Sequence, residues 1–472
     1  MIVVVIALYM VSVAGLALYG LLGFVTLALF LRYRHGQQPR VPVAPAEWPV
    51  VTVQLPLYNE RGVVTRLLEA TAALDYPRDC LQIQILDDST DDTTALAAAW
   101  VATRQAEGYD AILLHRAERQ GYKAGALGNG LDTARGEFIA IFDADFAPQP
   151  SFLRQTLPYL LDDPHLGAVQ TRWGHLNATE SALTGAQAIA LDKHFAVEQL
   201  VRHRAEYFPK FNGSAGVWRK TCIQAVGGWS AETLCEDLCL STRAVLAGWR
   251  FHFADDIVAP AELPRTIRAY KSQQARWATG ASQCLARYAA PIWRASDHSP
   301  LARLYALLSM SAYCTHLLLL LLLLVQLPLI LSGVRFPAWM VLFSALGLGQ
   351  PILFILAQQF LYPDWLRRLR YLPALLLLAI GTAPGNAWAV LRGLSGRRFV
   401  FVRTPKGAQP GYRLKAGNGV WAEAGLAVYS AVLLVLATWT GNTGAASLPL
   451  ISLLGFGYVA WLTGRESWLA AS

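Results

Sequence analysis

Charged residues are scarce in this chain, and the deficit is concentrated at its two ends. Asp, Glu, Lys and Arg make up 15% of the 472 residues, whereas a soluble globular protein carries about 25%. Residues 2–31 contain none of them. A helix of about 30 residues spans roughly 45 Å, which exceeds the hydrocarbon core of a bilayer. The stretch lacks the basic leader of a signal peptide and is too long for one. We therefore expect an N-terminal transmembrane helix over residues 1–32.

Paired cysteines, basic runs with interleaved aromatics and a glycine-rich dinucleotide motif are also lacking. The six cysteines include no C-x-x-C pair, which argues against a zinc site. No G-x-G-x-x-G follows the first expected strand, which argues against a dinucleotide dehydrogenase. The net charge of +8 comes largely from basic residues that flank apolar segments. Such residues fit contact with membrane lipid, and we expect no nucleic acid partner.

What is present is an alternation of strand-like and helix-like segments over residues 45–260. Apolar strand-like runs cover 50–55, 81–86, 111–115 and 138–142, and helix-like segments lie near 61–73, 92–107 and 122–134. This alternation predicts an α/β fold with a mostly parallel sheet and helices on both faces. In such sheets, ligands bind beyond the carboxyl ends of the strands.

Acidic residues follow two of the expected strands at that rim. Asp87 and Asp88 end the second strand, and Asp143 and Asp145 end the fourth. Two carboxylates at the mouth of a buried strand suit a divalent cation, Mg²⁺ or Mn²⁺, that carries a diphosphate. A further acid at Asp237 suits a general base. The later Gln-x-x-Arg-Trp set suits a sugar chain, because it offers an aromatic face and polar groups. The combination predicts an enzyme that transfers a sugar.

Seven motifs together resemble the processive family 2 glycosyltransferases, and most closely the cellulose synthase-like A mannan and glucomannan synthases of plants. They occur in family order over roughly residues 50–285: Gln54-Leu-Pro-Leu-Tyr-Asn-Glu60, Leu86-Asp-Asp-Ser-Thr-Asp91, Gly121-Tyr-Lys-Ala-Gly-Ala-Leu127, Ala140-Ile-Phe-Asp-Ala-Asp-Phe146, Phe211-Asn-Gly-Ser-Ala-Gly-Val-Trp218, Cys235-Glu-Asp237 and Gln273-Gln-Ala-Arg-Trp277. Cys235 departs from the family at a variable position. The resemblance implies a cytoplasmic nucleotide-binding domain of the glycosyltransferase-A type.

The resemblance also implies roles for individual residues. It makes Asp237 the catalytic base and Asp143 and Asp145 the metal ligands. The implied nucleotide-sugar-binding residues are Asp88, Lys123, Asp143, Asp145 and Arg276, and the implied acceptor-binding residues are Phe211, Gly213, Gln273 and Trp277. Structural alternatives stay open for three of these residues. Asp88 could cap a helix, Lys123 could be a surface lysine, and Trp277 could anchor an amphipathic helix at the membrane interface.

The C-terminal part of the chain becomes apolar again after amphipathic interface helices expected over 261–300. Apolar runs cover 303–331, 338–361, 371–385, 419–440 and 446–464. The loop from residue 392 to residue 406 is basic, and the positive-inside rule places it in the cytoplasm. We therefore expect segment 371–396 to be re-entrant or interfacial, which leaves five spans within residues 1–32 and 301–472. The N-terminus then lies outside, and the catalytic domain lies in the cytoplasm.

A basic motif follows this segment within residues 397–410. It contains Arg403, Thr404 and Lys406 and resembles the gating loop that closes over the nucleotide in processive synthases. A loop that touches lipid headgroups is the alternative interpretation.

We thus expect a multi-pass protein of the cell membrane that inverts the sugar configuration during transfer. The donor is a nucleotide sugar, namely GDP-mannose, GDP-glucose or UDP-glucose. The acceptor is a growing β-linked polysaccharide that the protein also translocates. Transfer of a single sugar to a membrane lipid is the alternative. A transporter without catalytic activity would explain the spans but not the acids at the strand ends.

Overall fold

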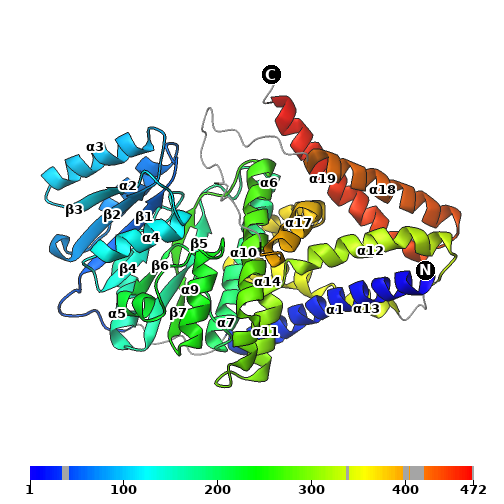
Figure 1. The fold of residues 1–472 in the computed structure, drawn as a ribbon, viewed down its shortest axis with the longest axis horizontal. Coiled ribbons are helices and arrows are strands. Elements are labelled where there is room, and N and C mark those ends of the chain that lie inside the picture. The colour runs from blue at the N-terminus through cyan, green and yellow to red at the C-terminus, as the bar shows by residue number, and fades with distance from the viewer. Residues whose placement is uncertain (35–41, 336–339, 397–402, 404–418, 470–472) are drawn as a thin grey trace.

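The computed structural model describes residues 1–34, 42–335, 340–396, 403 and 419–469. An α/β domain lies at one end of the molecule, and long apolar helices extend away from it (Figure 1). The N-terminus lies at the far end of α1, distant from the sheet.

A mixed sheet of seven strands forms the centre of the α/β domain, in the order β3-β2-β1-β4-β6-β5-β7. The strands are β1 Val51–Leu57, β2 Leu81–Asp87, β3 Asp110–His115, β4 Phe138–Ile141, β5 Leu166–His175, β6 Gly216–Arg219 and β7 Arg250–Ala261. The first four strands pair in parallel, as their alternation with helices predicts. Only β6 runs antiparallel, and it joins β4 to β5, while β5 and β7 pair in parallel. The prediction of a mostly parallel sheet is confirmed.

Helices cover both faces of the sheet, each with its own apolar core. One face packs against α2 Val64–Ala72, α3 Thr93–Ala106 and α5 Phe152–Asp162. The other packs against α4 Tyr122–Thr133, α8 Lys220–Ala225, α9 Glu236–Leu246 and the long helix α10 Ile267–Arg294. After β5 the chain forms α6 Ala182–Lys193, a π-helix over His194–Gln199 and α7 Leu200–Arg204. These elements lie between the sheet and the apolar helices.

Four described helices are long and apolar enough to cross a membrane: α1 Ile2–Tyr33, α12 Cys314–Leu331, α18 Gly419–Trp439 and α19 Ser447–Leu469. The helices over 365–381 and 383–394 together are also long and apolar enough to span a membrane, but they meet at 49°, which fits either a broken fifth span or a re-entrant loop. Within that pair, α16 Leu372–Gly381 is followed by α17 Ala383–Leu394. The chain therefore bends within the segment that we expect to be re-entrant.

Two of the expected apolar runs are interrupted in the structure. The run 303–331 divides into α11 Pro300–Met310 and α12, and the run 338–361 divides into α13 Val341–Leu346 and α14 Gly349–Leu361. The second break lies against α1 at very close range. A Cβ atom added to Gly20 would meet the Leu346 carbonyl oxygen at 2.4 Å, so only glycine permits this approach of the two backbones.

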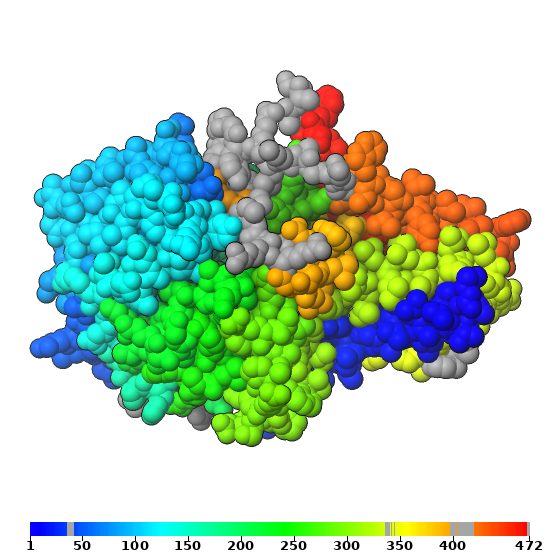
Figure 2. All heavy atoms as spheres, in the orientation of Figure 1, coloured from blue at the N-terminus to red at the C-terminus, as the bar shows by residue number. Residues whose placement is uncertain are grey.

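Helix α10 connects the α/β domain to the apolar helices. The side chain of Glu466 in α19 accepts hydrogen bonds from the first backbone amides of α10, at Ile267 (2.5 Å) and Arg268 (3.3 Å). Lys271 of α10 forms an ion pair with Glu423 of α18, whose side chain is 2% exposed. Figure 2 shows the two parts of the molecule joined through the α10–α11 segment on the face in view. The helix that carries the Gln-x-x-Arg-Trp motif is thus held by charged groups from two apolar helices.

Candidate functional site

A single cavity opens at the carboxyl ends of β1 and β4, and residues from all seven sequence motifs line it. The cavity lies where parallel strands of α/β sheets place ligands. Of the predicted site residues, ten line it: Asp88, Lys123, Asp143, Asp145, Gly213, Asp237, Gln273, Arg276, Trp277 and Arg403. Segments that are far apart in the sequence therefore form one site.

A lysine–aspartate pair lies at the centre of this cavity. Lys123 follows the tight turn that begins α4, where Gly121 has φ +74° and Tyr122 has φ +52°. Its Nζ lies 2.5 Å from Asp143 Oδ1 and donates to the Gly213 carbonyl at 2.8 Å. The surface lysine alternative is therefore wrong.

Each member of this pair opposes the effect of burial on the pKa of the other. Burial alone would lower the pKa of Lys123, but the carboxylates of Asp143 and Glu236 outweigh it and raise that pKa. Burial raises the pKa of Asp143, and Lys123 opposes this rise. Glu236 Oε1 lies 3.5 Å from Lys123 Nζ. The cavity thus contains one ammonium group that several carboxylates surround.

Asp237 stands in the first turn of α9 and faces the glycine of the fifth motif. A Cβ atom added to Gly213 would lie 3.0 Å from Asp237 Oδ2. Burial and the neighbouring Glu236 raise the pKa of Asp237 to about 7, against the opposing effects of Lys123, the Leu238 amide and Arg276. A carboxyl group with such a pKa can accept a proton near neutral pH, which a general base requires.

The predicted acceptor contact at Phe211 is not supported by its position. Phe211 is 1% exposed and packs edge-on against Trp218 in the core. Its backbone amide donates to Ser241 Oγ, which in turn donates to the Asp237 carbonyl. Phe211 therefore fixes the loop that carries Gly213 relative to α9. An aromatic residue beside a glycine in a motif does not reveal which way its ring points.

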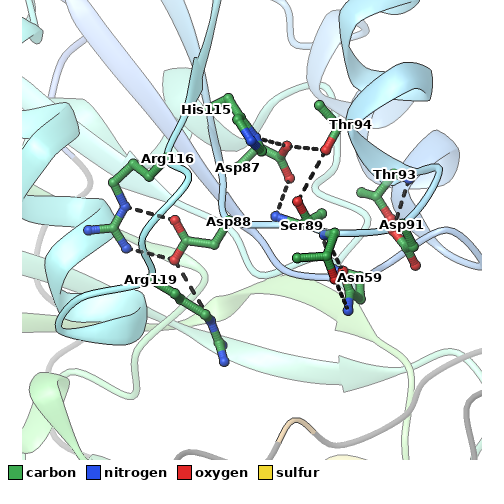
Figure 3. Close-up of polar contacts among 11 residues, drawn as sticks. Asn59, Asp87, Asp88, Ser89, Asp91, Thr93, Thr94, His115, Arg116 and Arg119 are labelled. Carbon is green, nitrogen blue, oxygen red and sulfur yellow. Dashed lines mark hydrogen bonds and ion pairs between the residues drawn. The ribbon is translucent and has the colours of Figure 1, made fainter.

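The carboxylates after β2 form a hydrogen-bonded cluster rather than a helix cap (Figure 3). Asp87 is fully buried and binds Thr94 Oγ1 (2.6 Å) and His115 Nδ1 (2.8 Å). Asp88 accepts two hydrogen bonds from Arg116, at 2.7 and 2.6 Å. Arg119 lies 3.8 Å from the same carboxylate and stacks on the ring of Tyr58 at 3.4 Å.

Asp88 therefore holds two arginines at the edge of the cavity. Arg119 and Tyr58 line the cavity as well, and sequence reasoning did not single them out. Tyr58 lies inside the first motif, and this position could have indicated that it belongs to the site.

Arg403 joins the C-terminal part of the chain to the cavity. It donates to Glu60 through Nε (2.9 Å) and a terminal nitrogen (2.6 Å), and its side chain is 4% exposed. Glu60 closes the first motif, just before α2. This two-point ion pair is charge-assisted and has a fixed geometry. Thr404 and Lys406, the other residues of the predicted gating loop, lie outside the described residues.

The two carboxylates at the end of β4 are suited to a divalent cation that arrives together with its substrate. Asp143 and Asp145 line the cavity side by side at the end of β4. No group of three or more His, Cys, Asp and Glu side chains in the described part of the chain could hold an ion alone. Mg²⁺ is commonly bound by one or two carboxylates together with substrate phosphates and water. Two acids beside an open cavity match that requirement.

Comparisons with known proteins show which proteins this chain is similar to. The chain is 42% identical to the probable glucomannan 4-beta-mannosyltransferase 7 of Oryza sativa subsp. japonica over 267 aligned residues. This alignment covers 56% of this chain and 46% of that protein. It is 44% identical to the glucomannan 4-beta-mannosyltransferase 2 of Arabidopsis thaliana over 239 residues, and that alignment covers 50% of this chain and 45% of the relative. The chain thus matches less than half of the length of these two relatives.

A solved structure supports the fold. The mannosyltransferase PcManGT from Pyrobaculum calidifontis, in complex with GDP-Man and Mn²⁺, aligns with a TM-score of 0.53 at 21% identity, over 82% of this chain and 98% of that one. The mixed sheet is therefore of the glycosyltransferase-A type. Residues 49–280 match the family described as glycosyltransferase like family 2. The chain therefore carries a glycosyltransferase family 2 domain.

Proposed function

We propose that this protein transfers a hexose from a nucleoside diphosphate sugar to a growing β-linked polysaccharide at a membrane. One observation carries the proposal: the Lys123–Asp143 pair, Asp237 and the Gln-x-x-Arg-Trp helix share one cavity. GDP-mannose is the first donor to test, because the similar plant proteins are named as mannosyltransferases and PcManGT was solved with GDP-Man. GDP-glucose and UDP-glucose are the next donors.

In the proposed reaction, Asp237 acts as the base. The acceptor hydroxyl oxygen attacks the anomeric carbon of the donor, and the bond between that carbon and the phosphate oxygen breaks. Asp237 takes the hydroxyl proton, while the nucleoside diphosphate leaves with the bonding electrons. Attack from the face opposite the diphosphate inverts the configuration, so an α-linked donor gives a β-linkage.

The cationic groups of the cavity stabilise the leaving diphosphate. Lys123 contributes a buried positive charge beside the carboxylates, and Arg276 can bind phosphate oxygens with its planar fork. A Mg²⁺ or Mn²⁺ ion bound by Asp143 and Asp145 would neutralise charge that develops on the leaving group. Arg119 and Tyr58 at the other edge offer a cationic and aromatic surface for the nucleoside.

The acceptor side is assigned to α10. Gln273 and Trp277 line the cavity from this helix, and an aromatic face is suited to stack on a sugar ring. Because α10 is also bonded to α18 and α19, a chain that leaves Trp277 emerges beside the apolar helices. We infer that these helices embed the protein in the membrane.

The proposed topology keeps the catalytic domain and Arg403 on one side. Tyr371, at the start of α16, packs on Gly185 of α6, where an added Cβ would approach the ring to 2.4 Å. At the other end, Gly393 of α17 lies against Thr279 of α10, with 2.7 Å from an added Cβ to the carbonyl oxygen. Both ends of this segment thus contact elements next to the catalytic domain. We infer that segment 371–396 enters and leaves the membrane from the cytoplasmic side.

A product assay tests the proposal. The purified protein is incubated with each radiolabelled nucleotide sugar and Mg²⁺ or Mn²⁺, and a sample in excess chelator is the control. Label in a high-mass product that a β-glycosidase degrades supports the polymerase. Label that extracts into organic solvent supports transfer to a lipid instead, and no transfer from any of the three donors contradicts the proposal.

A further inference from the structure

A second cavity lies apart from the catalytic one, between α6 and the turn that joins α14 to α16. Its volume is about 250 Å³, compared with roughly 30 Å³ for one water molecule in the liquid. One wall consists of small residues from α6, including Gly185 and Ala188. The opposite wall comes from the turn, which includes the short helix α15 Trp365–Arg368. We refer to this space as the α6–α15 cavity.

The wall from the turn is strongly basic. Three arginines line it, and Asp364 is the one acid among the lining residues. Arg368 is bonded to Asp364 at 3.1 Å and stacks on Tyr362. Arg370 donates to the neutral hydroxyl of Tyr371, and no ion pair involves Arg367 or Arg370 among the described residues. Two guanidinium charges therefore lack an anionic partner there.

The floor of the α6–α15 cavity is a polar group that is only partly satisfied. Gln358 of α14 is fully buried, and its Nε2 donates to Asp192 Oδ2 at 2.9 Å. Its Oε1 is buried and has no hydrogen-bond partner in the described structure. The hydrogen bond to Asp192 therefore fixes the orientation of the Gln358 side chain beneath the cavity.

The position of the α6–α15 cavity relates it to the membrane. The helices on either side of the turn, α14 and α16, consist mainly of apolar residues. Leu366, beside the arginines, is 69% exposed. Basic residues at the ends of apolar helices attract anionic lipids where the helices emerge from the bilayer. The turn therefore presents arginines where a phospholipid places its phosphate.

We propose that the α6–α15 cavity binds the headgroup of an anionic phospholipid. Arg367 and Arg370 bind the phosphate. The acyl chains then lie along the apolar surface of α14 and α16. Asp192, which holds Gln358, also binds His175 (3.0 Å), and His175 lines the catalytic cavity. The lipid site and the catalytic cavity thus share one buried carboxylate between their walls.

Lipid retention in native mass spectrometry tests this proposal without reference to glycosyl transfer. The full chain in detergent is titrated with phosphatidylglycerol or with phosphatidylcholine. We expect one phosphatidylglycerol to bind roughly tenfold more tightly than phosphatidylcholine, because two arginine charges favour the anionic headgroup. The double variant Arg367→Gln/Arg370→Gln should lose this preference. Arg294→Gln/Arg465→Gln, which removes the same charge from exposed positions outside the cavity, should keep it.

The outcomes separate the sources of the phosphate group. Added inorganic phosphate at millimolar concentration should not displace the lipid, and displacement would mean that the cavity takes a free phosphate instead. Equal losses of preference in the two double variants would mean that general surface charge attracts the lipid, which overturns the proposal. An unchanged preference in Arg367→Gln/Arg370→Gln would overturn it as well.

Discussion

Replacing Gly213 by alanine tests the geometry of the catalytic cavity with a single methyl group. Gly213 has φ +82°, and its added Cβ would lie 3.0 Å from Asp237 Oδ2 and 3.5 Å from Lys123 Nζ. Two effects follow from these numbers. A left-handed backbone costs a residue with a Cβ about 1–2 kcal/mol. The contact at 3.0 Å also forces the Asp237 carboxylate to move by a few tenths of an ångström.

A matched control separates the two effects. Gly108 has φ +84°, and an added Cβ there would meet nothing within 4 Å. Gly108→Ala therefore carries the same backbone cost without a contact in the cavity. Both variants should lower the apparent melting temperature by a similar amount, measured by scanning fluorimetry in detergent.

Only Gly213→Ala should impair transfer. Because a misplacement of about 1 Å can cost roughly 100-fold in rate, a smaller shift of the base should cost about tenfold in kcat. Rates measured with saturating donor, corrected for the folded fraction, provide the comparison. If Gly213→Ala and Gly108→Ala retain equal activity, the proposed contact of the base with this loop is wrong.

Three further predictions concern the cation, the C-terminal contact and the topology. Chelation should stop transfer, and Mg²⁺ or Mn²⁺ should restore it. Asp145→Ala should weaken nucleoside diphosphate binding in calorimetry. Full activity in excess chelator would contradict the proposed role of the cation. Because Glu60 and Arg403 form a two-point ion pair, the Glu60→Gln/Arg403→Gln double variant should lose less donor affinity than the two single losses summed, and additive losses would mean that the pair is not coupled. In a background without native cysteines, an impermeant thiol reagent added outside intact cells should label Ser332→Cys but not Ser395→Cys, and labelling of Ser395→Cys would refute the five-span topology.

Much of the catalytic half follows from local sequence signals. The first four strands and the three helices between them begin and end within a few residues of the expected segments. Strands β1, β2 and β4 are almost entirely buried, whereas the edge strand β3 is only partly buried and still has an apolar run. The acids at the ends of β2 and β4 reach one cavity because the two strands flank β1 in parallel. Strand β6 gave no such signal, since it has four residues and depends on its partners β4 and β5.

Other features depend on contacts between distant segments, which the local sequence does not predict. Glu60 and Arg403 are 343 residues apart in the sequence, and neither motif indicates the other as its partner. The close approach of the α13–α14 break to Gly20 and Gly23 of α1 joins segments more than 300 residues apart in the sequence. Phe211 was assigned to the acceptor on the basis of its motif, whereas packing against Trp218 determines its position. Tertiary contacts therefore decided the parts that sequence reasoning missed.

The most direct test of the account compares the wild type with Asp237→Asn in transfer from radiolabelled GDP-mannose. In the wild type, kcat/KM should rise with pH through about 7, because burial and Glu236 raise the pKa of Asp237 to about 7 and only the deprotonated base can accept a proton. Asp237→Asn keeps the shape of the side chain and removes its basicity. It should abolish transfer at every pH and leave nucleotide binding in calorimetry largely intact. Near-normal turnover in Asp237→Asn would contradict the assignment of the base and the mechanism that depends on it.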